Sequence, residues 1–367
     1  MERSYAARTS EAPPFNVEEL RPVRKPLVLN CLDPIFGHAL HKLLNAQHYI
    51  DHHPDFDLIL IIPRIMRWLV PEGTAAVWML GGTLSDSGQW NDWLATQIQK
   101  QLAPFDTVYL GAAFSHPHGR DYDIERFTGV TPFPLDEWVE RWEKPTVTFC
   151  WRETRLWAPE ERNLPVKQAR YARRFLQDSR IIPDQLRRQE QRIIALADAL
   201  HETMPNLDFA VAGVGDRGSL PNWLLDLRAP SPNDETERDW CARYAESHIV
   251  IGVQGSNMML PSALAGASVS LIPSGRWGSL LQDLLIDHQD ARMALLRHLS
   301  LPLQTSSEEV ARIAAALIRE WPFAAVRYND SDHDVYTRNP HRSGEAFRAI
   351  ARQLPVLRGE PPLKGGL

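Results

Sequence analysis

The chain has 367 residues, of which 44% are hydrophobic and 23% charged, and its formal net charge is −6. This length exceeds one ordinary hydrophobic core and predicts two domains, and the composition is typical of a globular protein. The acidic balance argues against a broad nucleic-acid-binding surface, although a local group of arginines can still bind phosphate.

The three cysteines, Cys31, Cys150 and Cys241, are too few for a disulfide framework, and their spacing fits no zinc site. The first residues lack the apolar core of a signal peptide, and the longest apolar run, residues 58–62, is too short to cross a bilayer. We therefore expect a cytoplasmic enzyme or binding protein, with no membrane span and no nucleic-acid partner.

The first part of the chain alternates short apolar runs with helical patterns. Residues 1–25 are polar and contain prolines, which predicts a flexible arm. The alternation that follows predicts a parallel βαβ sheet in an N-terminal domain over residues 26–143. The predicted strands are residues 26–31, 57–62, 75–80 and 107–111, and the predicted helices lie at 40–46 and 89–102.

The alternation restarts after a proline-containing stretch, residues 112–145, that favours loops and a short helix. The predicted strands are residues 146–151, 209–214, 249–253 and 268–272, and the predicted helices are 183–204, 235–246, 258–265 and one opened by a capping box at 306–309. A C-terminal domain is expected over residues 144–335, followed by a helix and tail over 336–367.

The predicted fold class is therefore α/β, with two Rossmann-like domains whose parallel sheets face a central cleft. In open sheets of this kind, ligands bind beyond the carboxyl ends of the strands. Polar residues that directly follow predicted strands are the candidates for a site.

Arg152 directly follows the predicted strand 146–151, and Arg155 is three residues further on. The planar guanidinium of an arginine can bind two phosphate oxygens at once. An anion site is the functional interpretation, and a surface pair with Glu153 at a domain edge is the alternative.

Residues 249–266 read as a buried strand, a glycine turn and a helix start. Gly255 allows a sharp turn and a close approach to a ligand, and Ser256 or Asn257 can cap the helix or bind a phosphate. The unpaired N–H groups and dipole of a helix start also favour an anion. The alternative is a capped helix with no ligand.

Gly215 and Asp216 follow the predicted strand 209–214. A carboxylate at this position can accept a hydrogen bond from a ribose hydroxyl or a base amine. Glycine and aspartate are also common turn formers, so a turn without a ligand is the alternative.

The first domain offers possible acid–base groups. Gly37 and His38 lie between its first strand and first helix, where the imidazole of His38 suits a general base, and His41 is a less favoured choice. His116, His118 and Asp121 lie in the last loop of this domain and are candidates for contacts to an acceptor or for a base. A half-buried histidine with ordinary hydrogen bonds is the alternative for His38.

The remaining motifs predict no further site. The acidic run at residues 330–334 can attract a divalent cation, but such runs are usually solvated, so no metal site is predicted. The sequence has no nucleophile elbow, no phosphate loop and no complete dinucleotide fingerprint.

Taken in order, these motifs resemble the two-domain GT-B glycosyltransferases, particularly their fucosyltransferase-like branch. The resemblance covers roughly residues 26–275, through short motifs only. It implies that the turn at 36–38 faces the cleft on the acceptor side, and that Arg152 binds the diphosphate of the donor. It also implies that residues 212–216 contact the nucleotide and that residues 252–262, which include Ser262, complete the pocket in the C-terminal domain.

The chain departs from the family patterns at three positions, one of which is His38, where an asparagine often follows the first glycine. Residues 250–255 also resemble the Val-Gly-x-His-Gly signature of a GT-B branch that transfers pentose and GlcNAc, but Gln254 replaces the histidine. Cys150 occupies the position of a histidine in the fucosyltransferase-like pattern. These departures concern the identity of the donor more than the fold.

The sequence therefore predicts a hexosyl- or deoxyhexosyltransferase that moves a sugar from a GDP- or UDP-linked nucleotide sugar to an acceptor hydroxyl on a glycan, a protein or a small molecule. The reaction is expected to be inverting and metal-independent, with no cofactor besides the nucleotide-sugar co-substrate. The catalytic residues are expected to be Arg152, with His38 first and Asp121 second as base. The donor-binding residues are expected to be Gly37, Arg152, Arg155, Gly215, Asp216, Gly255, Ser256, Asn257 and Ser262. The alternatives are a non-catalytic nucleotide- or sugar-binding protein of two domains and a sugar-nucleotide epimerase.

Overall fold

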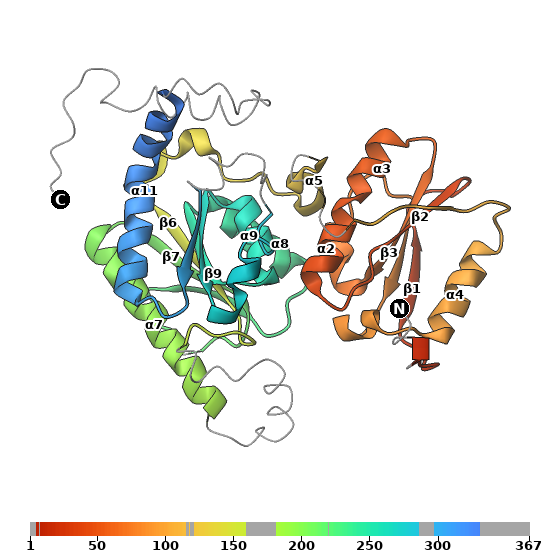
Figure 1. Ribbon diagram of the computed structural model, residues 1–367, viewed down its shortest axis with the longest axis horizontal. Helices are drawn as coiled ribbons and strands as arrows, with labels where there is room; N and C mark the ends of the chain where they lie inside the picture. Colours follow the sequence, from red (N-terminus) through yellow and green to blue (C-terminus); the bar gives the residue numbers. More distant parts are fainter. Residues whose placement is uncertain are drawn as a thin grey trace. The chain divides into compact units, whose positions relative to one another are not determined.

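The protein forms two compact α/β units, Met1–Val130 and Thr131–Leu367, each built around its own sheet (Figure 1). The structure is a computed structural model that describes residues 5–6, 8–114, 117, 121–158, 181–218, 220–285 and 297–330.

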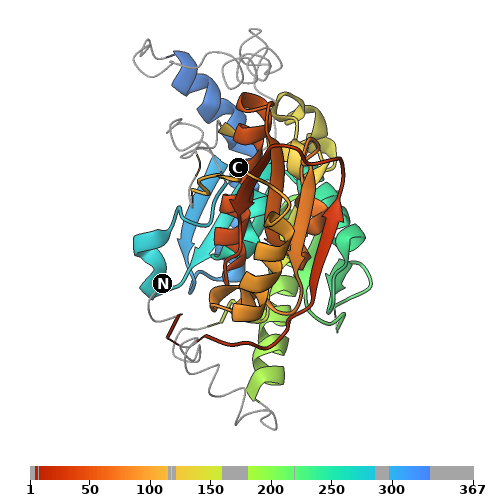
Figure 2. The ribbon, with the colours of Figure 1, turned by 90° about the vertical axis from the view of Figure 1, so that its right-hand side faces the viewer.

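The first unit holds a five-stranded sheet in the order β1-β4-β3-β2-β5. Its parallel strands lie side by side in Figure 2 and comprise β2 (Pro26–Asn30), β3 (Asp57–Pro63), β4 (Ala76–Leu80) and the short edge strand β5 (Tyr109–Leu110). Helices α2 (Phe36–Leu44) and α3 (Ala46–His52) contact β3 on one face, and apolar residues of α4 (Asp92–Leu102) pack on the other. The buried apolar runs of β2, β3 and β4 are those expected of central strands.

The arm predicted over residues 1–25 contains a strand. Residues Phe15–Glu19 form β1, which pairs antiparallel with β4 at the edge of the sheet. Phe15 packs against the core of the unit, while most of the strand is exposed. An edge strand needs only a few apolar contacts, so its polar sequence did not mark it as a strand.

The second unit holds a six-stranded sheet in the order β11-β10-β9-β6-β7-β8, with every neighbouring pair parallel. The strands are β6 (Thr146–Trp151), β7 (Asp208–Val214), β8 (Leu225–Ala229), β9 (Ile249–Val253), β10 (Ala267–Ile272) and β11 (His298–Pro302). Numbered along the unit, this is the 3-2-1-4-5-6 order of a Rossmann sheet. The direction of the strand order reverses between β6 and β9.

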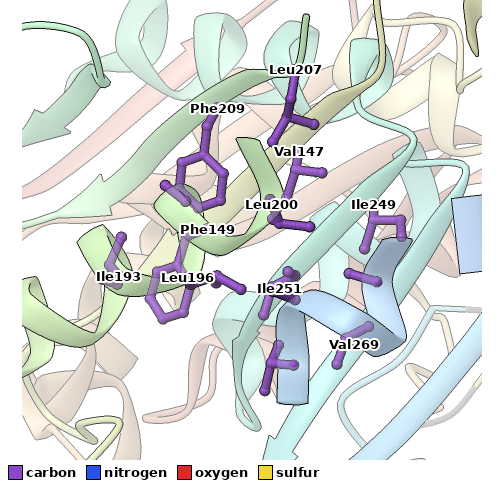
Figure 3. Close-up of a cluster of buried hydrophobic side chains, with 14 of the residues drawn as sticks. Val147, Phe149, Ile193, Leu196, Leu200, Leu207, Phe209, Ile249, Ile251 and Val269 are labelled. Atoms are coloured by element: carbon purple, nitrogen blue, oxygen red, sulfur yellow. The ribbon is translucent and has the colours of Figure 1, made fainter. Parts of the chain in front are cut away.

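The core of the second unit forms where alternate strand residues meet two long helices. Phe149, Phe209 and Ile251 pack against α7 (Ile181–Thr203), which contributes Ile193, Leu196 and Leu200 (Figure 3). Helix α11 (Ser307–Asp330) lies against α7 on this face and adds further apolar residues. Helices α8 (Asp234–Glu246) and α9 (Met259–Leu264) contact each other and the sheet through β6 and β10.

The division between the units precedes the predicted boundary at residue 143 because two turns of the intervening stretch pack in the second unit. The turns η4 (Leu135–Glu137) and η5 (Glu140–Glu143) flank the side chains that dock there. The indole nitrogens of Trp138 and Trp142 donate to the main-chain oxygen of Ile318 on α11, at 2.8 and 3.1 Å.

An ion-pair network anchors the outer strand β8. The Arg228 side chain is 1% exposed and donates to Glu190 of α7 at 2.9 Å and to Asp226 at 2.8 Å. Its guanidinium also lies 4.5 Å from the ring centroid of Trp151. A charge buried in this way is stable only while its partners remain.

We expect Glu190→Ala to lower the free energy of unfolding by about 2 kcal/mol, because Arg228 keeps Asp226 but loses one buried partner. Urea denaturation measures this change. As a control, Glu137→Ala removes the exposed partner of Arg141 and is expected to cost less than about 0.5 kcal/mol. Equal costs for the two substitutions would contradict the importance of the buried network.

The predicted α/β class with two mainly parallel sheets is confirmed. Within the described residues, none of the helices has the length and the apolar character needed to cross a membrane.

Candidate functional site

The candidate site lies at the carboxyl ends of β6 and β9, where the strand order of the second unit reverses. The two strands are parallel neighbours, and Cys150 stands opposite Gly252 near their ends. The loops that follow leave the sheet in opposite directions, which opens a crevice at such a point in Rossmann sheets. Arg152 starts one loop and Gln254 starts the other.

Arg152 is held by both loops. Its Nε donates to Thr154 at 2.9 Å, and its Nη1 donates to the side-chain oxygen of Asn257 at 3.0 Å. Its main-chain oxygen accepts from Gln189 of α7 at 3.2 Å. The guanidinium is thereby fixed at the end of β6, as the sequence pattern suggested.

Arg155 reaches the same turn, where its Nη1 donates to the main-chain oxygen of Gln254. The close approach of Arg152 and Arg155 to this turn depends on Gly255. A Cβ added there would overlap Arg152 Nη1 and would lie 3.0 Å from Arg155 Nη1. The glycine therefore lets two guanidinium groups approach the backbone closely.

Arg276 is a third cation that the sequence analysis missed. It lies on the turn η8 (Ser274–Ser279) after β10, and its Nε donates to the side-chain oxygen of Gln254 at 3.2 Å. Its Nη2 is 3.7 Å from the Asp283 carboxylate. The signal was present, because Arg276 lies in the turn after the buried strand β10, as Arg155 lies in the loop after β6.

Positive charge dominates this cluster. The pKa of Arg152 is lowered to about 10, first because burial removes water from its guanidinium, and also because Arg155 and Arg276 repel it, while Asp283 acts in the opposite direction. Burial and repulsion by Arg276 also lower the pKa of Arg155. Among the described residues, Asp283 is the carboxylate that acts on the pKa values of Arg152 and Arg155, so three guanidinium groups face little negative charge, an imbalance that a bound anion would relieve.

Asn257 adds a neutral donor to the cluster. Its side-chain oxygen already accepts from Arg152. Its Nδ2 is buried and has no hydrogen-bond partner among the described residues. A buried donor without a partner is costly, so an acceptor such as a phosphate oxygen would satisfy it.

The helix start predicted after β9 is less suited to bind an anion than expected. A 3-10 turn, η7 (Ser256–Met258), precedes α9, which has only 6 residues, and neither Ser256 nor Asn257 caps it. Ser262 is buried, donates to Met259 at 2.8 Å and accepts from the main chain of Leu285 at 3.0 Å. The arginines and Asn257, rather than a helix dipole or Ser262, are therefore the groups suited to bind an anion.

Gly215 and Asp216 lie after β7, the neighbour of β6. Gly215 is buried, and a Cβ there would overlap the indole nitrogen of Trp151, so close packing explains the glycine. Asp216 is exposed. Its position after β7, the neighbour of β6, is compatible with a contact to a nucleotide, and no hydrogen bond or ion pair to another described residue defines its role.

The predicted base lies inside helix α2 of the first unit rather than in the turn before it. Gly37 and His38 belong to the first turn of α2, which begins at Phe36. The Nδ1 atom of His38 is 3.3 Å from Asp33, and Lys42 is 2.9 Å from the same carboxylate. Asp33 was not predicted, because its pairing with His38 and Lys42 depends on the path of the chain between β2 and α2.

Two further predicted residues lie within the described part of the first unit. Asp121 is exposed, and His41 is buried within α2. His116, His118 and residues 331–334 lie outside the described residues. In the described part of the chain, no three His, Cys, Asp or Glu residues are grouped so as to hold a metal ion.

Comparisons with known proteins give only weak likenesses. No protein-family model matches the sequence, and no curated protein is significantly similar. A mutant of the Thermobaculum terrenum O-GlcNAc transferase aligns over 96% of this chain and 66% of its own, at 13% identity and a TM-score of 0.30. The wall teichoic acid polymerase TagF aligns over 92% of this chain and 86% of its own, at 9% identity and a TM-score of 0.27. These scores establish no relationship, and the function is inferred from the site itself.

Proposed function

We propose that the protein is a glycosyltransferase whose second unit binds the diphosphate of a nucleotide-sugar donor. The observation that carries the proposal is the group of three arginines, Arg152, Arg155 and Arg276, at the reversal point of an all-parallel Rossmann-type sheet. Nucleotides bind at this point in such sheets.

The charge of the cluster suits a leaving nucleoside diphosphate. When the bond from the sugar to the diphosphate breaks, negative charge grows on the phosphate oxygens. Preorganised cations and N–H donors stabilise that charge in the transition state. Arg152 and Arg155 are fixed before ligand arrives by their bonds to Asn257 and Gln254, and Asn257 Nδ2 supplies a further donor.

The finer assignments follow the fucosyltransferase-like pattern in the sequence. We assign a GDP- or UDP-linked hexose or deoxyhexose as donor, and a hydroxyl of a glycan, a protein or a small molecule as acceptor. We assign His38 as the base, because Asp33 lies beside its Nδ1 and leaves Nε2 to take the acceptor proton. Inversion and independence from metal ions belong to the same proposal, in which the arginines take the role that a metal ion would otherwise have.

A panel of GDP, UDP, dTDP and ADP in a thermal-shift assay tests the nucleotide site. We expect one of the four to raise Tm by several degrees, because a ligand at about 100 times its Kd stabilises the folded state by about 2.7 kcal/mol. If none of the four changes Tm, the assignment of a nucleotide-sugar donor is wrong.

Turnover then separates the proposed activity from its alternatives. Transfer releases free nucleoside diphosphate, whereas epimerisation keeps the nucleotide sugar intact and a binding protein leaves it unchanged. We expect release of the nucleoside diphosphate preferred in the panel, at the same rate with and without EDTA. Loss of turnover in EDTA would remove metal independence from the proposal.

A further inference from the structure

Gln254 occupies a fixed position at the centre of the arginine cluster. It directly follows β9, and its N–H donates to the main-chain oxygen of Leu271 at 3.0 Å, which continues the pairing of β9 with β10. Its main-chain oxygen accepts from Arg155. The residue is 1% exposed, so its amide is almost fully withdrawn from water.

Both polar atoms of the Gln254 amide bind the turn η8. The Nε2 atom donates to the main-chain oxygen of Ser279 at 2.8 Å, and Oε1 accepts from Arg276 Nε at 3.2 Å. The two bonds together specify the orientation of the amide, because only its nitrogen can donate to Ser279. One buried side chain thus holds the turn at two residues, and one of them is Arg276.

Of the two residues that the Gln254 amide binds, Arg276 is the one whose side chain is held in place by it. Its side chain is 41% exposed, and an arginine at the surface loses considerable rotamer freedom when it is fixed on a ligand. A bond that orients the guanidinium beforehand reduces this cost at the moment of binding. The substitution of glutamine for histidine in the Val-Gly-x-His-Gly pattern therefore has a structural role in this chain.

The three arginines approach from two sides of β9. Arg152 and Arg155 follow β6, while Arg276 follows β10, and β9 lies between these strands in the sheet. Cations on two sides suit an anion with two linked phosphoryl groups better than a single phosphate.

We propose that Gln254 is a positioning residue that holds Arg276 toward the second phosphoryl group of the ligand, and thereby makes the site prefer diphosphates to a single phosphate. This proposal rests on the proposed function in one respect: both assume that the three arginines form the anion site. It adds the residue that gives this site its preference.

Isothermal titration calorimetry with inorganic pyrophosphate and with inorganic orthophosphate tests the proposal in the full-length protein. Gln254→Leu removes both amide bonds, and Arg276→Met removes the cation that the amide holds. We expect each variant to weaken pyrophosphate binding by about tenfold, the scale of one hydrogen bond to a charged group, and orthophosphate binding by less than about twofold.

A double-mutant cycle provides a readout that a merely structural role would not move. If Gln254 acts through Arg276, Gln254→Leu costs less than about twofold in pyrophosphate affinity when Arg276→Met is already present. Additive losses, or an unchanged preference for pyrophosphate in Gln254→Leu, would overturn the proposal. If Gln254→Leu does not fold, an unchanged preference in Arg276→Met overturns it equally.

The two proposals fail in different ways. A wild-type protein that binds neither anion would overturn the anion site and the proposed function with it. A wild-type protein that prefers pyrophosphate, with variants that keep this preference, would overturn the role of Gln254 alone.

Discussion

Arg152→Met is expected to lower the rate of sugar transfer by about 10²-fold or more, while the protein stays folded. The guanidinium bonds to Asn257 and lies at the end of β6, where leaving-group charge is to be stabilised. Removal of one preorganised donor from such a site typically costs this much in rate. The measurement is the release of nucleoside diphosphate under saturating donor, with the melting temperature followed in parallel.

Two further substitutions sharpen this test. Arg152→Lys keeps the charge but lacks the planar fork, so it should recover only part of the lost rate. Arg188→Met removes an exposed arginine on α7 that pairs with Asp184, and it should transfer at the wild-type rate. Near-normal turnover by Arg152→Met would exclude this residue from stabilising the leaving group.

The strands that carry the site could be predicted from the sequence, because a parallel sheet covered on both faces needs uninterrupted apolar runs. The predicted strand 146–151 coincides with β6, and 249–253 coincides with β9. Strand β8 was missed, since Asp226 and Arg228 make it read as a polar segment. Arg228 pairs with Asp226 and also with Glu190, which is distant in the chain.

The candidate site also combines features that the local sequence predicts with features that depend on distant residues. Arg152, Arg155 and Asn257 could be named as candidates because they follow buried strands, and the structure brings them together. The bond from Arg276 to Gln254 joins turns after different strands, so no local pattern reveals it. The helix start at Ser256 was overestimated, because a short apolar segment does not show how many helical residues follow the turn.

Gly255→Ala is the second substitution with a large expected effect, and we expect it to weaken nucleoside diphosphate binding by about 100-fold. The added Cβ would overlap Arg152 Nη1, lie 3.0 Å from Arg155 Nη1 and lie 2.9 Å from Asn257 Oδ1. One methyl group would therefore displace three groups of the proposed anion site together. A displacement of about 1 Å at a site of this kind can cost 100-fold.

The atoms that must move are the ends of side chains, but Gly255 has a φ of 158° and a ψ of 175°, a backbone conformation that favours glycine, so alanine also adds backbone strain. We expect the Tm of Gly255→Ala to fall by roughly 2–12 °C, which corresponds to about 1–3 kcal/mol of backbone strain in a unit of this size, so the variant should remain folded at 25 °C. Gly275→Ala is the matched control, since a Cβ at Gly275 meets nothing within 4 Å although the residue lies beside Arg276. A Gly255→Ala variant that binds as tightly as Gly275→Ala would show that the close approach of the arginines to this turn does not form the anion site. Loss of affinity in Gly255→Ala alone, with both proteins folded, would instead show that ligand binding depends on this turn and on the groups packed against it.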